Sequence, residues 1–325
     1  MLACGEPEMN VLPVANPEEQ VLIKIQNDPT NIPLSEALQI VRAIAHKTGS
    51  ETVLIDESEG RILSEPIYAS SDLPGFNRAT MDGFALLASD TIHASGQNPC
   101  ILKYVGLVAK GIPDGKQIIS GQALAIQTGG VVPEGADTII PREDCTYIGK
   151  SVIIPRSIEP GMHISRNDED FKKNKQIYPE GWMIRTQDIP ILASLGKIRI
   201  KVRKKPIIGI ISTGKELVPS ESIPKPGEVR EVNSHLIATF CRRQGAVPMK
   251  YGIVRDDPKE LASLLKEVSD ECDAIMISGG SNRDHNDITA QVVRSLGKVY
   301  TEGISFAPDK RTTIGKIGTV LVIGL

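Results

Sequence analysis

Aromatic residues are scarce in this 325-residue chain, where 6 Tyr, 5 Phe and 1 Trp make up only 4% of the sequence. Proteins that hold single-stranded nucleic acid stack its bases on aromatic side chains, so this class is disfavoured. An excess of positive charge is also lacking, because 37 Lys and Arg face 40 Asp and Glu, which leaves a net charge of −3. A general nucleic-acid binder needs a basic surface, so we expect no nucleic-acid partner.

Cysteine pairs and long apolar runs are missing as well. The five cysteines are scattered without a C-x-x-C pair, which favours reduced thiols in a cytosolic protein. The five histidines show no paired metal-ligand spacing, which disfavours a zinc enzyme. No stretch approaches 18 apolar residues, and the first thirty residues do not resemble a secretory leader. We therefore expect a soluble, cytoplasmic protein with no membrane partner.

The residues that are present indicate a globular chain with many turns. The hydrophobic share is 40%, and 29 Gly and 22 Pro are spread along the sequence. A chain of this length forms two or three compact units. We predict an α/β multidomain protein whose parts are a loose extension at 1–30, a discontinuous elongated α+β domain at 31–70 and 155–200, an inserted β domain at 71–154, and an α/β domain at 201–325.

Three local patterns support this division. Leu34, Leu38, Val41 and Ala45 recur at helical spacing, which predicts a helix over 33–49 that ends at Gly49 in a left-handed conformation. Residues 71–154 contain short alternating runs between Gly and Pro, a pattern typical of a small all-β unit. The basic stretch 201–206 is interpreted as a solvated linker.

Beyond the linker the pattern changes to strands that alternate with helices. We predict strands at 207–211, 247–254 and 274–277, and helices that begin with Asn233 as the N-cap, at Pro258 after the cap Asp257, and near Ile288. Strands alternating with helices form a mostly parallel sheet with right-handed crossovers.

Polar segments follow three of these strands, at 212–216, 255–257 and 278–280. Ligands of open parallel sheets bind outside the carboxyl ends of the strands, so we expect a site there. Backbone at Gly279 and Gly280 can approach an anion closely, and Glu216, Asp256 and Asp287 are candidate ligands for Mg²⁺ beside a phosphate. The alternatives are that Gly279 and Gly280 form only a turn and that His285 is an exposed loop residue rather than a metal ligand.

Eight phrases in the same order resemble the molybdopterin molybdenumtransferase family, called MoeA in bacteria and represented by the E domain of gephyrin. They lie at 81–85 (MDGFA), 128–129 with 133–137 (TG and PEGAD), 169–170 (ED), 192–196 (LASLG), 212–217 (STGKEL), 233–234 (NS), 255–258 (RDDP) and 278–280 (SGG). By spacing alone, the segments near 79–85 and 127–137 are β-hairpin turns.

The resemblance implies a fold and a reaction. Members have a discontinuous elongated domain, an inserted β domain, a molybdopterin-binding α/β domain and a last β domain. They form a homodimer whose cleft uses both subunits. They insert molybdate into adenylylated molybdopterin with Mg²⁺ and release AMP, and a molybdopterin adenylyltransferase is an implied partner. This chain resembles a divergent member that lacks the last β domain.

The resemblance also implies site residues. Six positions match functional acidic or polar residues of the family: Glu216, Asp256 and Asp287 for metal and water near the pyrophosphate bond, and Asp82, Thr128 and Asp170 for shaping the cleft from the other subunit. The implied cofactor-binding residues are Thr213, Gly214, Ser278, Gly279, Gly280, Ser281, Arg283, Lys310 and Arg311.

The chain departs from the family at its anion-binding positions. Ala307 and Gly303 stand where the family has lysines, Lys215 replaces an Asp, and a bulky charged segment follows Gly280. Each charged hydrogen bond lost to an anion costs about 1.5 to 3 kcal/mol, although Arg283, Lys310 and Arg311 can supply replacement charge. The sequence therefore leaves two hypotheses: a transferase, or a non-catalytic carrier or sensor that keeps the molybdopterin-binding fold. It does not distinguish molybdate from tungstate.

Overall fold

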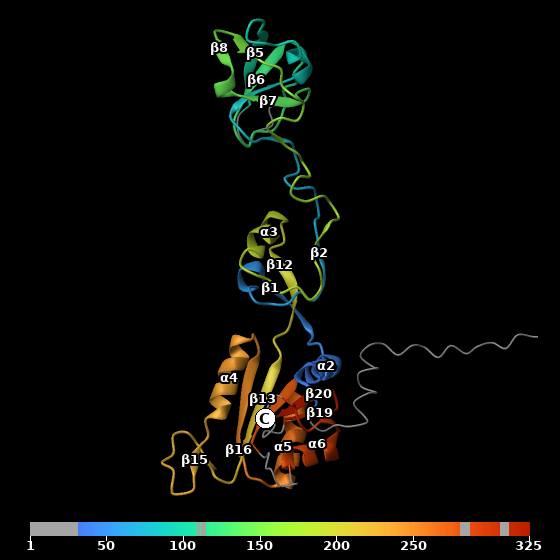
Figure 1. The fold of residues 1–325 in the computed structure, drawn as a ribbon, viewed down its shortest axis with the longest axis vertical. Helices are drawn as coiled ribbons and strands as arrows, with labels where there is room; N and C mark the ends of the chain where they lie inside the picture. Colours follow the sequence, from blue (N-terminus) through green and yellow to red (C-terminus); the bar gives the residue numbers. More distant parts are fainter. Residues whose placement is uncertain (1–31, 109–110, 112–114, 280–286, 306–311) are drawn as a thin grey trace, which may run out of the picture. The chain divides into compact units, whose positions relative to one another are not determined.

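The computed structural model describes residues 32–108, 111, 115–279, 287–305 and 312–325 (Figure 1). These residues form two compact units, one made of residues up to 51 and from 202 onward, the other of residues 52–201. The predicted extension at 1–30 lies outside the described residues, as do Gly280, Ser281, Arg283, His285, Lys310 and Arg311.

The first unit is a three-layer α/β structure built on one six-stranded sheet. Its sheet has the order β16-β13-β17-β20-β19-β18, in which β16, β13, β17 and β20 are parallel while β19 is antiparallel to both neighbours. Its elements are α2 (Leu34–Ile44), β13 (Ile207–Thr213), β14 (Leu217–Val218), β15 (Val229–Arg230), α4 (Asn233–Arg243), β16 (Val247–Val254), α5 (Pro258–Glu271), β17 (Ala274–Ser278), α6 (Ile288–Leu296), β18 (Lys298–Thr301), β19 (Thr313–Ile317) and β20 (Val320–Gly324).

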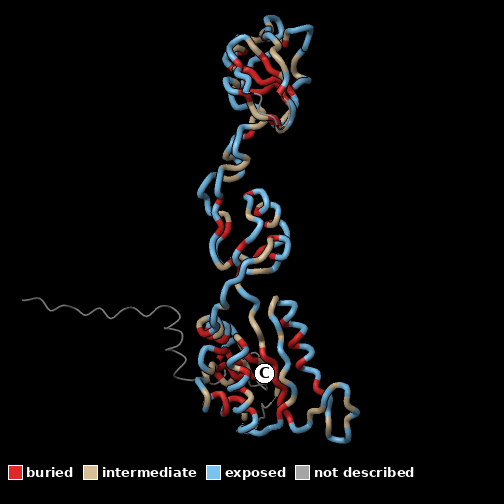
Figure 2. Tube along the Cα trace, turned by 180° about the vertical axis from the view of Figure 1, so that it is seen from behind, coloured by how far each residue is buried: buried red, intermediate tan, exposed pale blue. Residues whose placement is uncertain are grey.

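Alternation along the strands explains why both faces of this sheet are covered. Ile210 packs with α4, while the next residue, Ile211, packs with α5 and α6 on the opposite face. Gly209 allows α5 to come close, because a Cβ there would lie 2.7 Å from the Val268 side chain. The predicted mostly parallel sheet is confirmed. Its inner strands β13, β17 and β20 are mostly buried, whereas the edge strand β16 is mostly exposed or half-buried (Figure 2).

The helix near residue 40 is present, but its predicted buried face and its predicted end are wrong. Leu34 and Leu38 are about half exposed, and the buried stripe is Ala37, Ile40 and Ile44, which packs against β19 and β20. The helix ends at Ile44, and Ala45 leaves it in an extended conformation, five residues before the sheet strand that starts at Ser50. Ala37, Ile40 and Ile44 form a second apolar stripe on the helix, beside the predicted one. Contact with β19 and β20, which lie far away in the sequence, decided which of the two stripes is buried.

Residues 32–51 and 202–325 form one of the two compact units, and the grouping of 31–70 with 155–200 stays a prediction. The basic stretch that was interpreted as a linker begins inside a strand, β12 (Arg199–Arg203), where Ile200 and Val202 are buried and β1 (Ser50–Leu54) is the partner. Alternate apolar residues, rather than the neighbouring charges, determine this local structure. The finer four-part division stays a prediction.

The second unit contains a six-stranded β sheet, which lies within residues 71–154, the range predicted for the inserted β domain. The sheet has the order β7-β4-β6-β5-β9-β8 and buries Phe84, Leu102, Ile140 and Val152 on one side. The unit's elements are η1 (Ile55–Glu57), β2 (Ile67–Tyr68), β3 (Arg78–Ala79), β4 (Gly83–Leu86), η2 (Ala88–Thr91), β5 (Cys100–Val108), β6 (Gln122–Ile126), β7 (Thr138–Pro141), η3 (Arg142–Asp144), β8 (Thr146–Ile148), β9 (Ser151–Ile154), β10 (Ile164–Ser165), β11 (Gln176–Tyr178) and α3 (Asp188–Ser194).

No helix within the described ranges has the length and apolar character needed to cross a bilayer.

Candidate functional site

The carboxyl ends of β13 and β17 form the centre of the candidate site in the first unit. The chain leaves β13 through α4 to reach β16 on one side, and later reaches β17 on the other side of β13. Such a reversal of direction opens a crevice at the strand ends, which is where open α/β sheets bind ligands. The predicted residues Thr213, Gly214, Ser278 and Gly279 all lie at this edge.

Hydrogen bonds between side chains organise this edge. Thr213 Oγ1 donates to Asp256 Oδ1 at 2.9 Å, which connects the end of β13 to the segment after β16. Asn233 Nδ2 donates to Ser278 Oγ at 2.7 Å, which connects α4 to the end of β17. The first contact joins two of the three predicted polar segments, and the third lies beside them because Ser278 in β17 pairs with Ser212 in β13.

Gly279 is required by the geometry of this edge. Its φ is +96°, and a Cβ on it would lie 2.1 Å from the carbonyl oxygen of Thr213. Any other residue would therefore push β13 and β17 apart at their ends. The alternative that Gly279 is part of a simple turn leaves this close contact unexplained.

Asp287 lies at the start of α6 and is 7% exposed. Its Oδ1 accepts from the backbone N–H of Ala290 at 3.0 Å, and its Oδ2 accepts from Thr313 Oγ1 at 3.4 Å. Both carboxylate oxygens thus have partners within the unit, and the N-cap contact stabilises the helix. Asp287 therefore stabilises the start of α6, whether or not it also contacts a ligand.

The predicted metal set is not gathered in the structure. Among the described residues, no group of three or more His, Cys, Asp or Glu side chains lies close enough together to hold a metal ion. Glu216 is exposed and folds back over Gly214, where a Cβ would lie 2.9 Å from its Oε1. Glu216, Asp256 and Asp287 therefore do not form a three-carboxylate centre here.

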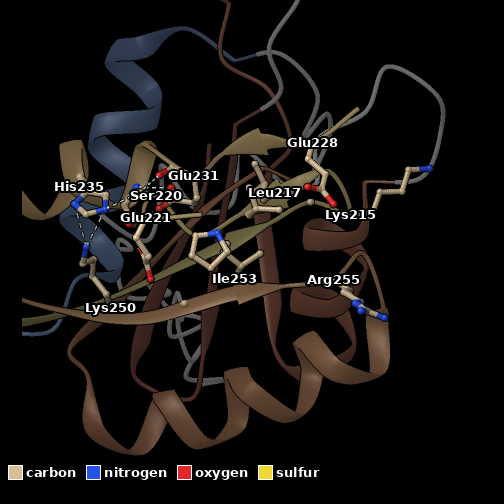
Figure 3. Close-up of a pocket in the computed structure, with 15 residues that line it drawn as sticks. Lys215, Leu217, Ser220, Glu221, Glu228, Glu231, His235, Lys250, Ile253 and Arg255 are labelled. Atoms are coloured by element: carbon tan, nitrogen blue, oxygen red, sulfur yellow. Dashed lines mark hydrogen bonds between the residues drawn. The ribbon is translucent and has the colours of Figure 1, made fainter. Parts of the chain in front are cut away.

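A cavity of about 670 Å³ lies beside this edge, under the short ladder of β14 and β15. Figure 3 shows His235 and Lys250 at one end of the cavity and Lys215 and Arg255 at the other. Leu217 and Ile253 lie between these two basic groups, and the lining also contains Glu221, Glu228 and Glu231.

Glu231 is the buried acid of this cavity. Its carboxylate accepts from the backbone N–H of Ser234 at 2.7 Å and from Ser234 Oγ at 2.5 Å. Burial works to raise the pKa of Glu231, but the hydrogen bonds from Ser234 and the nearby His235 lower it overall. Glu231 thereby binds the first turn of α4, and the predicted N-cap Asn233 is instead the first helical residue after Val232. Asn233 is consequently free of a capping role and contacts Ser278.

Sequence reasoning missed His235 and Lys250. Lys250 Nζ lies 3.3 Å from His235 Nδ1, and Ser220 Oγ lies 3.1 Å from His235 Nε2. The two residues come from the consecutive elements α4 and β16, and neither belongs to a recognisable motif. His235 lies in the first turn of α4, but Lys250 lies in the middle of β16, where no local signal marks it.

The second unit brings the other predicted residues into one neighbourhood. Both the backbone N–H and the hydroxyl of Thr128 donate to Asp82 Oδ1 at 2.7 Å. Arg78 in β3 lies 3.8 Å from Asp170 through its Nη2, and the following residue, Ala79, donates its backbone N–H to Gly130 in the loop after Thr128. All three predicted residues of this unit are thus connected through β3.

Comparison with known proteins matches both units. A family model described as the MoeA N-terminal region (domain I and II) matches residues 32–196, and one described as "Probable molybdopterin binding domain" matches residues 209–325. A Methanocaldococcus jannaschii protein assigned provisionally to molybdopterin biosynthesis is 36% identical over 81% of this chain and 66% of its own length. The molybdopterin molybdenumtransferase of Bacillus subtilis is 30% identical over 91% of this chain and 70% of its own length.

Solved structures agree with these matches. Two crystal structures of the molybdopterin biosynthesis MoeA protein of Pyrococcus horikoshii have TM-scores of 0.78 and 0.77 at 34% and 30% identity. They cover 91% and 90% of this chain and 74% of each solved chain. Because both family models match in order along the chain and solved relatives share its fold, the chain belongs to the MoeA family of molybdopterin biosynthesis proteins.

Proposed function

We propose that this protein inserts molybdate into adenylylated molybdopterin and releases AMP. The observation that carries the proposal is the hydrogen-bonded polar edge of β13 and β17, where Thr213 holds Asp256 and Asn233 holds Ser278. A family match and a polar edge at the reversal point together support a molybdopterin substrate at this place.

The reaction balances without an oxidant. Two thiol sulfurs of molybdopterin replace one oxide of molybdate, and that oxide leaves as water with the two thiol protons. One water is added across the pyrophosphate bond, which gives molybdopterin phosphate and AMP as dianions together with two protons. Molybdenum stays in its highest oxidation state, so the protein has to bind and orient two anions rather than transfer electrons.

Basic residues of the cavity are suited to those anions. Lys215, Lys250 and Arg255 line it, and they lie in the described part of the chain, unlike Arg283, Lys310 and Arg311. They offer charge that can offset the loss of the family lysines at Gly303 and Ala307. Asp256 lies beside this group and, held by Thr213, is placed to orient water or a substrate hydroxyl.

The magnesium requirement stays a prediction. Carboxylate oxygens suit Mg²⁺, which often uses only one or two carboxylates plus substrate phosphates. The described residues do not assemble a metal centre on their own, so no step is assigned to the metal. Repeating the reaction with a chelator and then restoring Mg²⁺ measures the requirement.

The decisive experiment follows AMP. The purified chain is incubated with adenylylated molybdopterin and molybdate, and AMP is measured by chromatography beside a no-protein control and a no-molybdate control. Molybdate-dependent AMP release above both controls is expected. Binding of the substrate without release would instead establish the carrier or sensor hypothesis. Tungstate in place of molybdate tests oxyanion selectivity in the same assay.

We also propose that the protein forms the homodimer that the resemblance implies. Val232, which precedes α4, and Leu236 and Phe240 on α4 are spaced by four residues and are 63%, 71% and 61% exposed. A stripe of this kind is suited to packing against a second copy. Leu236→Glu should shift the mass measured by light scattering from dimer to monomer, while the neighbouring exposed Thr239→Glu should not. A molybdopterin adenylyltransferase partner and a cytoplasmic location stay predictions.

A further inference from the structure

An irregularity in strand β16 turns two of its residues toward the cavity of the first unit. Lys250 and Ile253 are three positions apart, so in a regular strand they would point to opposite faces of the sheet. The pairing with β13 shifts between Lys250 and Gly252, which leaves Tyr251 as an extra residue, and Gly252 has a φ of +87°. Lys250 and Ile253 consequently both line the cavity, while Tyr251 packs against α5. A β-bulge that re-aims side chains is typical of functional sites, which indicates a role for this wall of the cavity.

A chain of hydrogen bonds holds the His235 ring and defines which of its nitrogens meets Lys250. Ser220 Oγ donates to the backbone carbonyl of Glu231 at 2.6 Å, and it therefore accepts from His235 Nε2–H at 3.1 Å. That leaves Nδ1 as the acceptor for Lys250 Nζ, which lies 3.3 Å from Nδ1 and 3.5 Å from Nε2. One hydrogen of the ammonium is used in this contact, and two remain for a ligand. His235 is thus a positioning residue for Lys250.

The acids of the cavity lining leave this ammonium available. Glu231 is held by the first turn of α4, and Glu228 accepts from the backbone N–H of Lys225 at 2.9 Å. Within the described ranges, Lys250 forms no ion pair with a carboxylate, that of Glu221 included. A charge that is positioned by a neutral partner remains able to bind an anion.

The cavity keeps its two basic ends apart. Lys215 and Arg255 lie just beyond the ends of β13 and β16, and Lys250 lies at the opposite end, with Leu217 and Ile253 between them (Figure 3). Pockets for drug-sized ligands measure about 300 to 1,000 Å³, so a cavity of about 670 Å³ has room for two separate anions. The proposed reaction needs places for two anions.

We propose that the Lys250 end of this cavity binds a tetrahedral oxyanion, which in the reaction is free molybdate. A lysine ammonium is a compact charge that suits a small oxyanion, whereas the planar guanidinium of Arg255 matches a phosphate group. Lys215 and Arg255 then take the phosphate groups of the other substrate. The inference rests on the proposed function, because it names where the oxyanion of that reaction is held.

Molybdate binding to the full chain is the direct test. Sodium molybdate is equilibrated with the purified protein by dialysis, bound molybdenum is measured by mass spectrometry, and AMP is titrated in parallel. Lys250→Gln should weaken molybdate binding about tenfold, because a charged hydrogen bond is lost, and should leave AMP binding within about twofold. Lys266→Gln is the matched control, because Lys266 is exposed in α5 and lies outside the cavity. It should change neither affinity.

Three outcomes would overturn the inference. The first is an equal loss of molybdate binding in Lys250→Gln and Lys266→Gln, and the second is the lack of saturable molybdate binding to the original chain. The third is a loss of AMP binding rather than molybdate binding in Lys250→Gln, which would assign this end of the cavity to the phosphate of an adenylyl group.

Variants of His235 test its positioning role. His235→Leu should weaken molybdate binding about fivefold, because the ammonium loses its acceptor. His235→Asn should bind within about twofold of the original chain, since the amide oxygen can replace Nδ1 as the acceptor. Unfolding midpoints show whether both variants fold. Equal losses in the two folded variants would contradict positioning through Nδ1.

The outcome is separable from that of the proposed function. Molybdate binding that depends on Lys250 in a protein without AMP release would keep this inference and overturn the catalytic proposal. AMP release with an unaltered rate and an unaltered KM for molybdate in Lys250→Gln would do the reverse.

Discussion

Two carboxylates, one in each unit of this protein, have opposite surroundings. In the second unit, Asp188 is 1% exposed and accepts hydrogen bonds from Tyr178, Trp182 and Arg185. In the first unit, Asp256 is exposed at the strand ends and accepts from Thr213. An acid surrounded by donors within its own unit holds the fold together, whereas an exposed acid held by a single donor remains accessible to a ligand.

The electrostatics of Asp188 agree with a structural role. Burial works to raise its pKa, but the hydrogen bonds from Arg185, Trp182 and Tyr178 are stronger and lower it to about 2. Burial and the nearby Asp188 raise the pKa of Tyr178 to about 12, so the phenol stays a donor.

Replacing the buried acid should have the largest effect. Asp188→Asn puts an amide donor among three donor side chains and should lower the free energy of unfolding of the second unit by about 3 kcal/mol. Denaturant unfolding measures the loss. Asp168→Asn is the control, because Asp168 pairs with the exposed Arg166 and should change stability by less than about 0.5 kcal/mol. Equal losses in both variants would contradict the structural role of Asp188.

Replacing the exposed acid should change activity without changing stability. Asp256→Asn should slow AMP release about 100-fold, since it removes a charge next to the reacting groups, and should leave the unfolding free energy within about 0.5 kcal/mol. Its neighbour provides the control: Asp257 caps α5 by accepting from Lys259 N at 2.9 Å, and Asn caps equally well. An unchanged rate in Asp256→Asn would remove Asp256 from the proposed machinery.

The first unit also contains a buried acid, which refines the comparison. Ser234→Ala removes the hydroxyl that donates to Glu231 and should destabilise the first unit by about 1.5 kcal/mol, because the backbone N–H of residue 234 still donates. Thr239→Ala, on an exposed turn of the same helix, should cost less than about 0.5 kcal/mol. A smaller loss in Ser234→Ala than in Thr239→Ala would show that Glu231 is not held as described.

Lowering the pH should reduce the difference in stability between the original chain and Asp188→Asn. The folded pKa of Asp188 is lowered from 3.8 to about 2, so its contribution to stability is complete above the ordinary value and disappears as the pH falls toward 2. Unfolding midpoints at pH 7, 4, 3 and 2 should therefore converge for the two proteins below pH 4. A difference that stays constant down to pH 2 would show that Asp188 is not charged in the fold.

Prediction from sequence worked best where the local pattern was strong. Strand β16 and helix α6 have the predicted bounds, and Asp257 caps α5 as expected, because Asp-Pro before an apolar period is a specific local signal. Prediction failed where a distant contact decided the outcome. The buried face of α2 depends on β19 and β20, which follow it by more than 250 residues and cannot be inferred from helical spacing.

For the candidate site too, local sequence signals predicted some features and distant contacts decided the others. Residue patterns alone predicted the family, the parallel sheet, and the polar segments after β13, β16 and β17, because strand, turn and cap signals are local and the family phrases are collinear. Three contacts could be seen only in the folded protein: Asn233 holds Ser278, His235 meets Lys250, and the rings of Phe84, Tyr104 and Tyr147 pack together in the second unit. Strand order and packing create those contacts, and both depend on which distant surfaces bury one another rather than on any residue's neighbours in the chain.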